Sequence, residues 1–121
     1  MGVPQTLQRQ QRLKSRKQID ALFREGHSFA IYPLRIVFRE VSPEAEPLKF
    51  GVSVSTRYFK KAVDRNLMKR RIREAWRLQR APLEGLPLHV FVLYTAKELL
   101  PYDRISRSMG QAIEKLKDGR S

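Results

Sequence analysis

An amphipathic helix between two strand-like segments constrains the fold of this chain more than any other feature of its sequence. Residues 48–55 (LKFGVSVS) alternate apolar and small polar side chains, as a strand with one buried face does. Residues 88–94 (LHVFVLY) are apolar on both faces apart from one histidine, as in a central strand. Between them, a helix over residues 62–80 carries one apolar stripe with a single amide. The stripe consists of Met68, Ile72, Ala75, Trp76 and Gln79. Because a crossover helix joins parallel strands, this unit predicts a parallel pair.

The rest of the chain adds a helix at each end and further strands. The first helix is expected to start at its N-cap Ser15 and to end at Gly26. Residues 34–41 predict a strand, and residues 42–47 (SPEAEP) a turn or short loop. A last helix follows Pro101 and buries Ile105, Met109, Ala112, Ile113 and Leu116. The predicted class is a two-layer α+β sandwich of order αβββαβα, one domain over 1–121 whose residues 1–13 form a flexible basic arm.

The basic charge is localised. The 121 residues contain 25 Lys and Arg against 12 Asp and Glu, which gives a formal net charge of +13. Residues 1–24 carry a net charge of +5 and residues 57–80 a net charge of +8, so the other 73 residues are neutral overall. Charge concentrated in two segments is typical of an electrostatic binding surface for an anionic partner.

Several classes of protein and site are excluded. The chain has no cysteine and only two histidines, which excludes disulfides, thiol nucleophiles and the common zinc sites. It has no phosphate-binding glycine loop, no paired acids for two-metal chemistry, no membrane-length apolar run and no secretory signal. We therefore expect no catalytic side chain, no metal site in the protein and no membrane partner. His89, within an apolar strand, is interpreted as a core histidine. The predicted location is the cytoplasm.

A cationic face lies beside the apolar stripe of the helix over 62–80. In the helix, basic and amide side chains occupy one neighbouring arc, and Glu74 lies outside it, within reach of Arg70 and Arg77. The members of this arc are Asn66, Lys69, Arg70, Arg73, Arg77 and Arg80. A solvated face, a nuclear-localisation signal and a membrane-surface helix are alternatives, but polyanion binding fits best. No helix-turn-helix is present to read DNA.

The first helix and the strand over 48–55 together suggest a groove for single-stranded RNA. The helix offers Ile19 and Phe23 as an apolar wall, and the strand offers Ser53 and Ser55 as a small polar floor. Such a groove suits an extended strand with stacked bases. The alternative is that Ile19, Leu22 and Phe23 are simply core residues. For Leu22, a core role is at least as good an interpretation as a role in the groove.

Residues 62–77 (AVDRNLMKRRIREAWR) resemble the signature of the bacterial ribonuclease P protein subunit. The match covers Ala62, Val63, Arg65, Asn66, Lys69, Arg70, Arg73 and Glu74. The opening RLKSRKQIDALFREG and the strand FGVSVS also resemble that family. Two departures stand out. Ile19 replaces the usual aromatic, and the loop over 56–61 is one residue longer than usual and lacks its glycine.

The resemblance implies a division of labour within a ribonucleoprotein. The RNA subunit, with Mg²⁺ that it mainly holds itself, would hydrolyse precursor tRNA, and the protein would bind that catalytic RNA and the 5′ leader. The implied RNA-binding residues are Arg65, Asn66, Lys69, Arg70 and Arg73, with Arg57, Lys60 and Lys61 from the preceding loop and Arg77 from the cationic arc. The implied leader cleft contains Ile19, Phe23, Val37 and Ser53, to which the groove adds Ser55. The fold implied is ribosomal-protein-like, with a left-handed strand–helix–strand crossover. The alternative function is a non-catalytic structural RNA-binding protein, such as a ribosomal or RNA-assembly factor.

Overall fold

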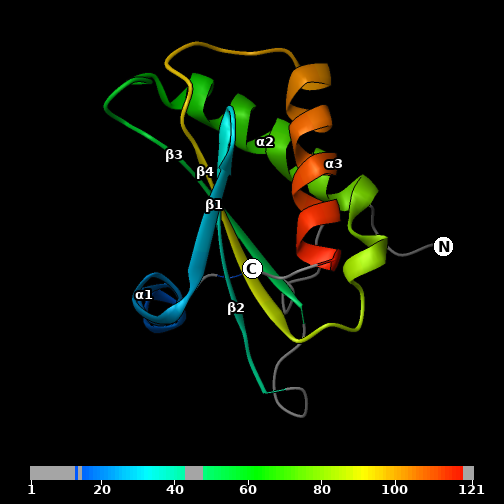
Figure 1. Cartoon of the computed structure of the whole chain (residues 1–121). Coiled ribbons are helices and arrows are strands. Elements are labelled where there is room, and N and C mark those ends of the chain that lie inside the picture. Colours follow the sequence, from blue (N-terminus) through cyan, green and yellow to red (C-terminus); the bar gives the residue numbers. More distant parts are fainter. Residues whose placement is uncertain (1–12, 14, 43–47, 119–121) are drawn as a thin grey trace, which may run out of the picture.

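The computed structural model describes residues 13, 15–42 and 48–118 (Figure 1). These residues form eight secondary-structure elements. In chain order they are α1 (Arg16–Glu25), β1 (His27–Ile31), β2 (Leu34–Glu40), β3 (Lys49–Val54), α2 (Ala62–Gln79), the 3₁₀ turn η2 (Ala81–Leu83), β4 (Leu88–Tyr94) and α3 (Tyr102–Asp118). This order confirms the predicted α+β class. Of the loop predicted over 42–47, all but Ser42 lies outside the described residues.

The sheet places β4 in its interior. The strand order is β1-β2-β4-β3, with β4 antiparallel to β2 and parallel to β3. The parallel pair predicted from the strand–helix–strand unit is confirmed, with α2 as the crossover. Phe91 of β4 is opposite Val37 of β2 on one side and Gly51 of β3 on the other. These three residues lie on the same face of the sheet.

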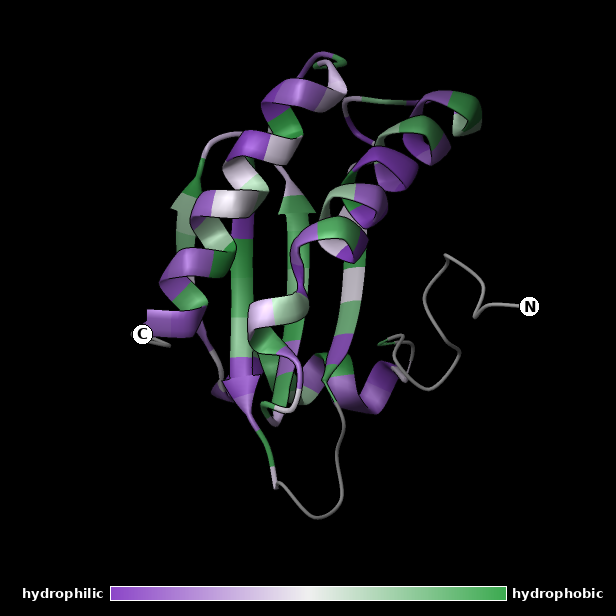
Figure 2. Cartoon of the chain, turned by 90° about the vertical axis from the view of Figure 1, so that its right-hand side faces the viewer, coloured by the Kyte–Doolittle hydropathy of each residue, from purple (hydrophilic) through white to green (hydrophobic). Residues whose placement is uncertain are grey.

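The main core lies between the other face of the sheet and the helices α2 and α3. Figure 2 shows both helices in front of the strands. The predicted stripe of α2 is confirmed, because Met68, Ile72, Ala75 and Trp76 are all buried. The Trp76 ring stacks on Phe50, with ring centroids 4.4 Å apart. The amide of Gln79 donates to the backbone carbonyl of Ser106 at 3.0 Å, which joins α2 to α3.

Helix α1 covers part of the opposite face (Figure 1). Its predicted start is confirmed, since the Ser15 hydroxyl accepts a hydrogen bond from the backbone N–H of Gln18 at 3.3 Å. Leu22 is fully buried and packs in a small cluster with Leu13, Val37 and Phe91. Leu22 is therefore a core residue. The two-layer sandwich of sheet, α2 and α3 thus carries one further helix on its outer face.

The prediction of a flexible arm over residues 1–13 is wrong for its last residue. Leu13 is 4% exposed, and its backbone N–H donates to the carbonyl of Phe50 at 2.8 Å. An apolar residue two positions before the N-cap can pack under the helix that follows, and Leu13 does so. The remaining twelve residues of the predicted arm lie outside the described residues.

Gly51 leaves the space that the Phe91 ring occupies. A Cβ atom on Gly51 would lie 2.6 Å from Cδ1 and 2.7 Å from Cε1 of Phe91. We expect Gly51→Val to lower the free energy of unfolding by roughly 1–3 kcal/mol, because the ring must move out of a packed cluster. Urea unfolding followed by Trp76 fluorescence measures this, with Ser53→Ala on the same face of β3 as the control. Equal stability of Gly51→Val and the native chain would contradict the packing described for Phe91.

Candidate nucleic-acid interface

The residues predicted to bind RNA, eight cations and Asn66, lie along α2 and the loop that leads into it. Each turn of α2 brings residues three and four apart onto the same side, so the side next to the buried stripe collects the polar residues. Exposed members are Arg57, Lys60, Lys61, Asn66, Arg70 and Arg73, while Arg65, Lys69 and Arg77 are half-buried. We call these nine residues the cationic face.

Some arginines of α2, and the arginine that follows it, already bind groups within the protein. Arg77 forms an ion pair with Glu74, with 3.1 Å between Nε and Oε1. This hydrogen bond lowers the pKa of Glu74 and raises the pKa of Arg77. Arg71 donates to the carbonyl of Leu100 at 2.6 Å, and Arg80 pairs with Glu84 at 2.7 Å. The charge available for binding is therefore smaller than the sequence count and is concentrated in the first half of α2 and its loop.

Arg65 ties the loop to the helix. Its Nη1 donates to the carbonyl of Phe59 at 2.7 Å and to that of Lys60 at 3.0 Å. Phe59 is 6% exposed and packs in the main core. The Ser55 hydroxyl accepts the backbone N–H of Arg57 at 2.9 Å, which closes the turn at the start of the loop. The loop thus has a defined path without the family's glycine, and this path presents Lys60 and Lys61 to solvent.

We expect Arg65→Gln to loosen this loop while leaving the helix folded. Loss of the two hydrogen bonds should cost about 1 kcal/mol locally, which corresponds to roughly fivefold faster amide exchange over residues 57–61. Hydrogen–deuterium exchange measures this, with Arg70→Gln on the exposed side of α2 as the control. If both variants exchange at the native rate over 57–61, Arg65 does not hold the loop.

The residues predicted for the leader cleft lie on and beside the face that α1 partly covers. The Phe23 side chain is 48% exposed, and its ring meets Phe91 edge-on with centroids 5.5 Å apart. Ile19 is half-buried against the same cluster, and Val37 is 6% exposed within it. Ser53 is half-buried, opposite Leu93 of β4. Phe23 and Ser53 therefore present accessible surface, whereas Val37 mainly supports the packing beneath them.

Ser55, Phe91 and Leu93 also border this region. Ser55 follows β3 and uses its hydroxyl to close the loop turn, so it links the floor to the cationic face. Phe91 and Leu93 of β4 complete the floor, although the sequence-based cleft omitted them. The sequence contains the pattern that identifies them. Because side chains of a strand alternate between its faces, an apolar strand such as β4 places every second residue on the face that α1 partly covers.

The described residues hold neither a cluster of metal-binding side chains nor a membrane-spanning helix. Within residues 13, 15–42 and 48–118, no three His, Asp or Glu side chains lie close enough together to hold a metal ion. Among the described helices, none combines the length and apolar character that a membrane span requires. His89 is 1% exposed, as expected for a histidine of the interior strand β4.

Comparisons with known proteins converge on one family. The family model described as Ribonuclease P matches residues 7–117. A ribonuclease P protein component of Porphyromonas gingivalis is 43% identical over 75 residues, which is 61% of this chain and 55% of that relative. The chain thus aligns with little more than half the length of this relative. One from Picosynechococcus is 35% identical over 99 residues, covering 81% of this chain and 80% of the relative.

A solved structure shares the fold. The RNase P protein of Staphylococcus aureus superposes with a TM-score of 0.74 at 24% identity, covering 89% of this chain and 95% of that protein. At this identity the likeness speaks for the fold alone. It agrees with the predicted α+β class, with one four-stranded sheet and three α-helices among the described residues.

Proposed function

Because the chain belongs to the family of ribonuclease P protein components, we propose that it is the protein subunit of a ribonuclease P ribonucleoprotein. This particle is an endoribonuclease that removes the 5′ leader of precursor tRNA. The protein subunit would bind the catalytic RNA and the leader, and the RNA would carry the hydrolysis. The observation that carries this proposal is the exposed set Lys60, Lys61, Asn66, Arg70 and Arg73 on the family's signature helix and its loop.

The cationic face would bind the RNA subunit by neutralising phosphates. Lysine and arginine side chains that replace condensed counterions gain affinity from counterion release, and the gain decreases as salt increases. Arginine also hydrogen-bonds phosphate through two parallel N–H groups. The Arg65 contacts described above would hold Lys60 and Lys61 in place before binding, which reduces the entropy cost of association.

Magnesium would belong to the RNA subunit. The described residues bring no three carboxylate or imidazole ligands together, so they do not fit a magnesium site of the protein's own. Mg²⁺ held by RNA would supply the activated water for hydrolysis when bound. The cationic face would instead reduce the repulsion between phosphates of the RNA subunit and the substrate.

The cleft beside α1 would hold the leader as an extended single strand. The half-exposed ring of Phe23 offers a surface on which a base can stack, and Ser53 offers a small polar floor beside Leu93. Each base–aromatic stack contributes roughly 1–3 kcal/mol to binding. Ile19 can contribute only an apolar contact, so Phe23 would provide the main stacking partner. Processing of tRNA would place the protein in the cytoplasm, away from membranes and DNA.

We expect Phe23→Ala to weaken binding of precursor tRNA by roughly fivefold or more in the reconstituted particle, from the lost stack. Binding of mature tRNA, which has no leader, should stay unchanged. Competition between labelled precursor and mature tRNA measures both affinities. Leu78→Ala, an exposed apolar residue of α2 (58% exposed), is the control. A loss of affinity that is equal for both tRNAs would exclude Phe23 from the leader cleft.

The alternative is a structural RNA-binding protein, such as a ribosomal or RNA-assembly factor. Purification of the tagged protein from cells, followed by sequencing of the bound RNA, separates the two. One dominant catalytic RNA together with precursor tRNA supports the proposed function. Enrichment of ribosomal RNA instead would favour the alternative.

A further inference from the structure

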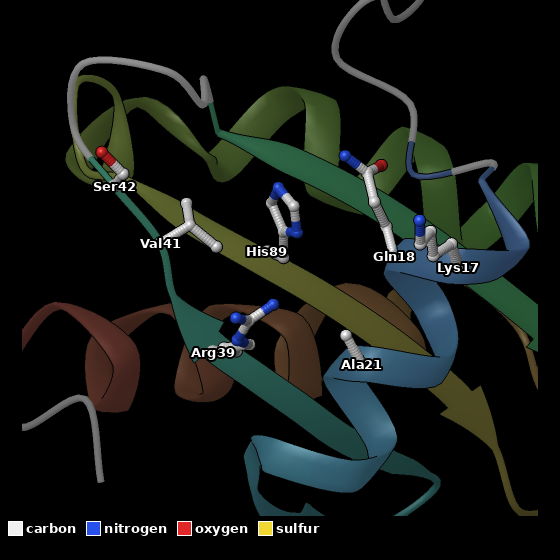
Figure 3. A pocket seen from close by; sticks show the side chains of 7 residues that line it. All are labelled: Lys17, Gln18, Ala21, Arg39, Val41, Ser42 and His89. Atoms are coloured by element: carbon white, nitrogen blue, oxygen red, sulfur yellow. The ribbon is translucent and has the colours of Figure 1, made fainter.

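A hollow lies on the flank of α1 that faces away from Ile19 and Phe23 (Figure 3). It has a volume of about 320 Å³ and is lined by Lys17, Gln18, Ala21, Arg39, Val41, Ser42 and His89. On a helix with 100° per residue, Leu22 points at the sheet, with Gln18 and Ala21 on one side of it. Ile19 and Phe23 fall on the other side. The hollow and the leader cleft are therefore separate sites on the two sides of α1. Leu22, which packs against the sheet, divides them.

The hollow is rich in cations. The Lys17 side chain is exposed at its rim, and Arg39 is opposite His89 in the pairing of β2 with β4. Lys49 is opposite His89 on the β3 side, and its ammonium donates to the Gln18 side-chain oxygen at 3.5 Å. Glu25 forms an ion pair with Arg39 at 3.1 Å. Among the described residues, Lys17, Arg39 and Lys49 thus bring three cations to this hollow, of which Arg39 is paired with Glu25, and this local excess suits an anionic ligand.

His89 gives the hollow a fixed polar base. Figure 3 shows its imidazole standing on β4 between Val41 and Gln18. The side chain is 1% exposed, so its position is set by packing and not by solvent. An imidazole, an amide and a hydroxyl can each bond to a phosphate oxygen or to a base edge. Ala21 and Val41 add small apolar walls against which a ribose or base can pack.

We propose that this hollow binds one nucleotide through its phosphate. The volume is at the lower end of the range for small-ligand sites and suits a single nucleotide unit, not a folded RNA element. The phosphate would meet Lys17 and Arg39, and the nucleoside would lie over Ala21 and Val41. The nucleotide can be part of the leader, part of the RNA subunit, or a free nucleotide. All three share the phosphate that the cations recognise.

The two histidines of the chain make a direct test possible on the protein alone. His89 lines the hollow, whereas His27 is exposed on β1 and its ring contacts Phe38. At constant pH and ionic strength, uridine 5′-monophosphate should shift the imidazole NMR signals of His89 in a saturable way, and those of His27 much less. Uridine, which lacks the phosphate, should bind at least tenfold more weakly. No shift at His89, or equal linear shifts at both histidines, would overturn the proposal.

Variants on α1 provide the matched control. Lys17→Gln should weaken the nucleotide affinity at least fivefold, while Arg24→Gln, an exposed cation on the same helix outside the hollow, should leave it unchanged. Equal weakening by both would mean that overall charge, not this hollow, binds the nucleotide, and would overturn the proposal. Because this test needs no RNA, it can fail or succeed independently of the proposed function.

The same variants identify the source of the nucleotide in the reconstituted particle. If the leader occupies the hollow, Lys17→Gln lowers the affinity for precursor tRNA and not for mature tRNA. If the RNA subunit occupies it, the affinity of the protein for that RNA decreases. Unchanged affinity for both RNAs, together with a saturable NMR shift, assigns the hollow to free nucleotides.

Discussion

Replacing Trp76 with alanine is expected to lower the free energy of unfolding by roughly 3–5 kcal/mol. The side chain is 1% exposed in the main core, between α2 and the sheet, and its ring stacks on Phe50 at 4.4 Å. Truncation would remove a large apolar contact area and leave a cavity that the rigid sheet cannot close. Urea unfolding followed by far-UV circular dichroism measures the change, since the variant lacks the only tryptophan.

The matched control lies two residues further along the same helix. Leu78 is 58% exposed, so Leu78→Ala should change the free energy of unfolding by no more than about 0.5 kcal/mol. A Trp76→Ala variant as stable as Leu78→Ala would contradict the orientation of α2. The assignment of the side of α2 next to the buried stripe as the cationic face would then be lost as well.

Neutralising the cationic face should have an equally large effect on RNA binding. Replacement of Lys60, Lys61 and Arg70 with glutamine removes three exposed cations from α2 and its loop. If each contacts one phosphate, the slope of log K against log salt should decrease in magnitude by about 2–3. At about 0.1 M salt the same loss corresponds to affinity on the order of 100- to 1,000-fold weaker. Filter binding to the RNA subunit across a salt series measures both quantities.

A second triple variant controls for overall charge. Arg107, Lys115 and Lys117 are exposed on α3, so their replacement with glutamine removes the same charge from a different helix. This variant should bind RNA within about threefold of the native affinity, because only long-range, screened attraction is lost. Equal losses for the two triple variants would show that RNA binding depends on net charge and not on the cationic face.

The helices could be predicted from the sequence because the spacing of their apolar residues determines which side of each helix faces the core. Met68, Ile72 and Trp76 are four residues apart, and all three are buried against the sheet. The strand over 88–94 was also evident, since a run that is apolar on both faces requires cover on both sides. That requirement predicts that another element packs on the second face of the sheet. In the structure, Leu22 of α1 packs there against Phe91.

The contacts of long polar side chains could not be predicted in the same way. Arg65 and Arg71 belong to the same basic run in the sequence, yet their guanidinium groups bind backbone carbonyls of Phe59 and Leu100. Those contacts depend on where a loop passes, and helix periodicity carries no information about loop paths. The burial of Leu13 has the same origin, because its hydrogen bond to Phe50 forms only once β3 is in place.

The residues predicted to form the leader cleft differ in exposure. Phe23 is half-exposed, as a stacking partner must be, whereas Val37 is covered by the cluster around Phe91. The difference arises because α1 crosses the sheet over the row that contains Val37, and the sequence does not specify that crossing position. The hollow around His89 depends on the same crossing, since it forms on the flank of α1 that Ile19 and Phe23 do not occupy.

Reconstitution with the RNA subunit tests the proposed function most directly. The protein is added to its cognate RNA and a precursor tRNA at low magnesium concentration, and the rate of 5′ leader removal is measured with and without it. The protein should accelerate cleavage and increase the preference for precursor over mature tRNA, and the triple variant at Lys60, Lys61 and Arg70 should lose most of this effect. Neither faster cleavage nor tighter binding of precursor than of mature tRNA would contradict the assignment of this chain as the protein subunit.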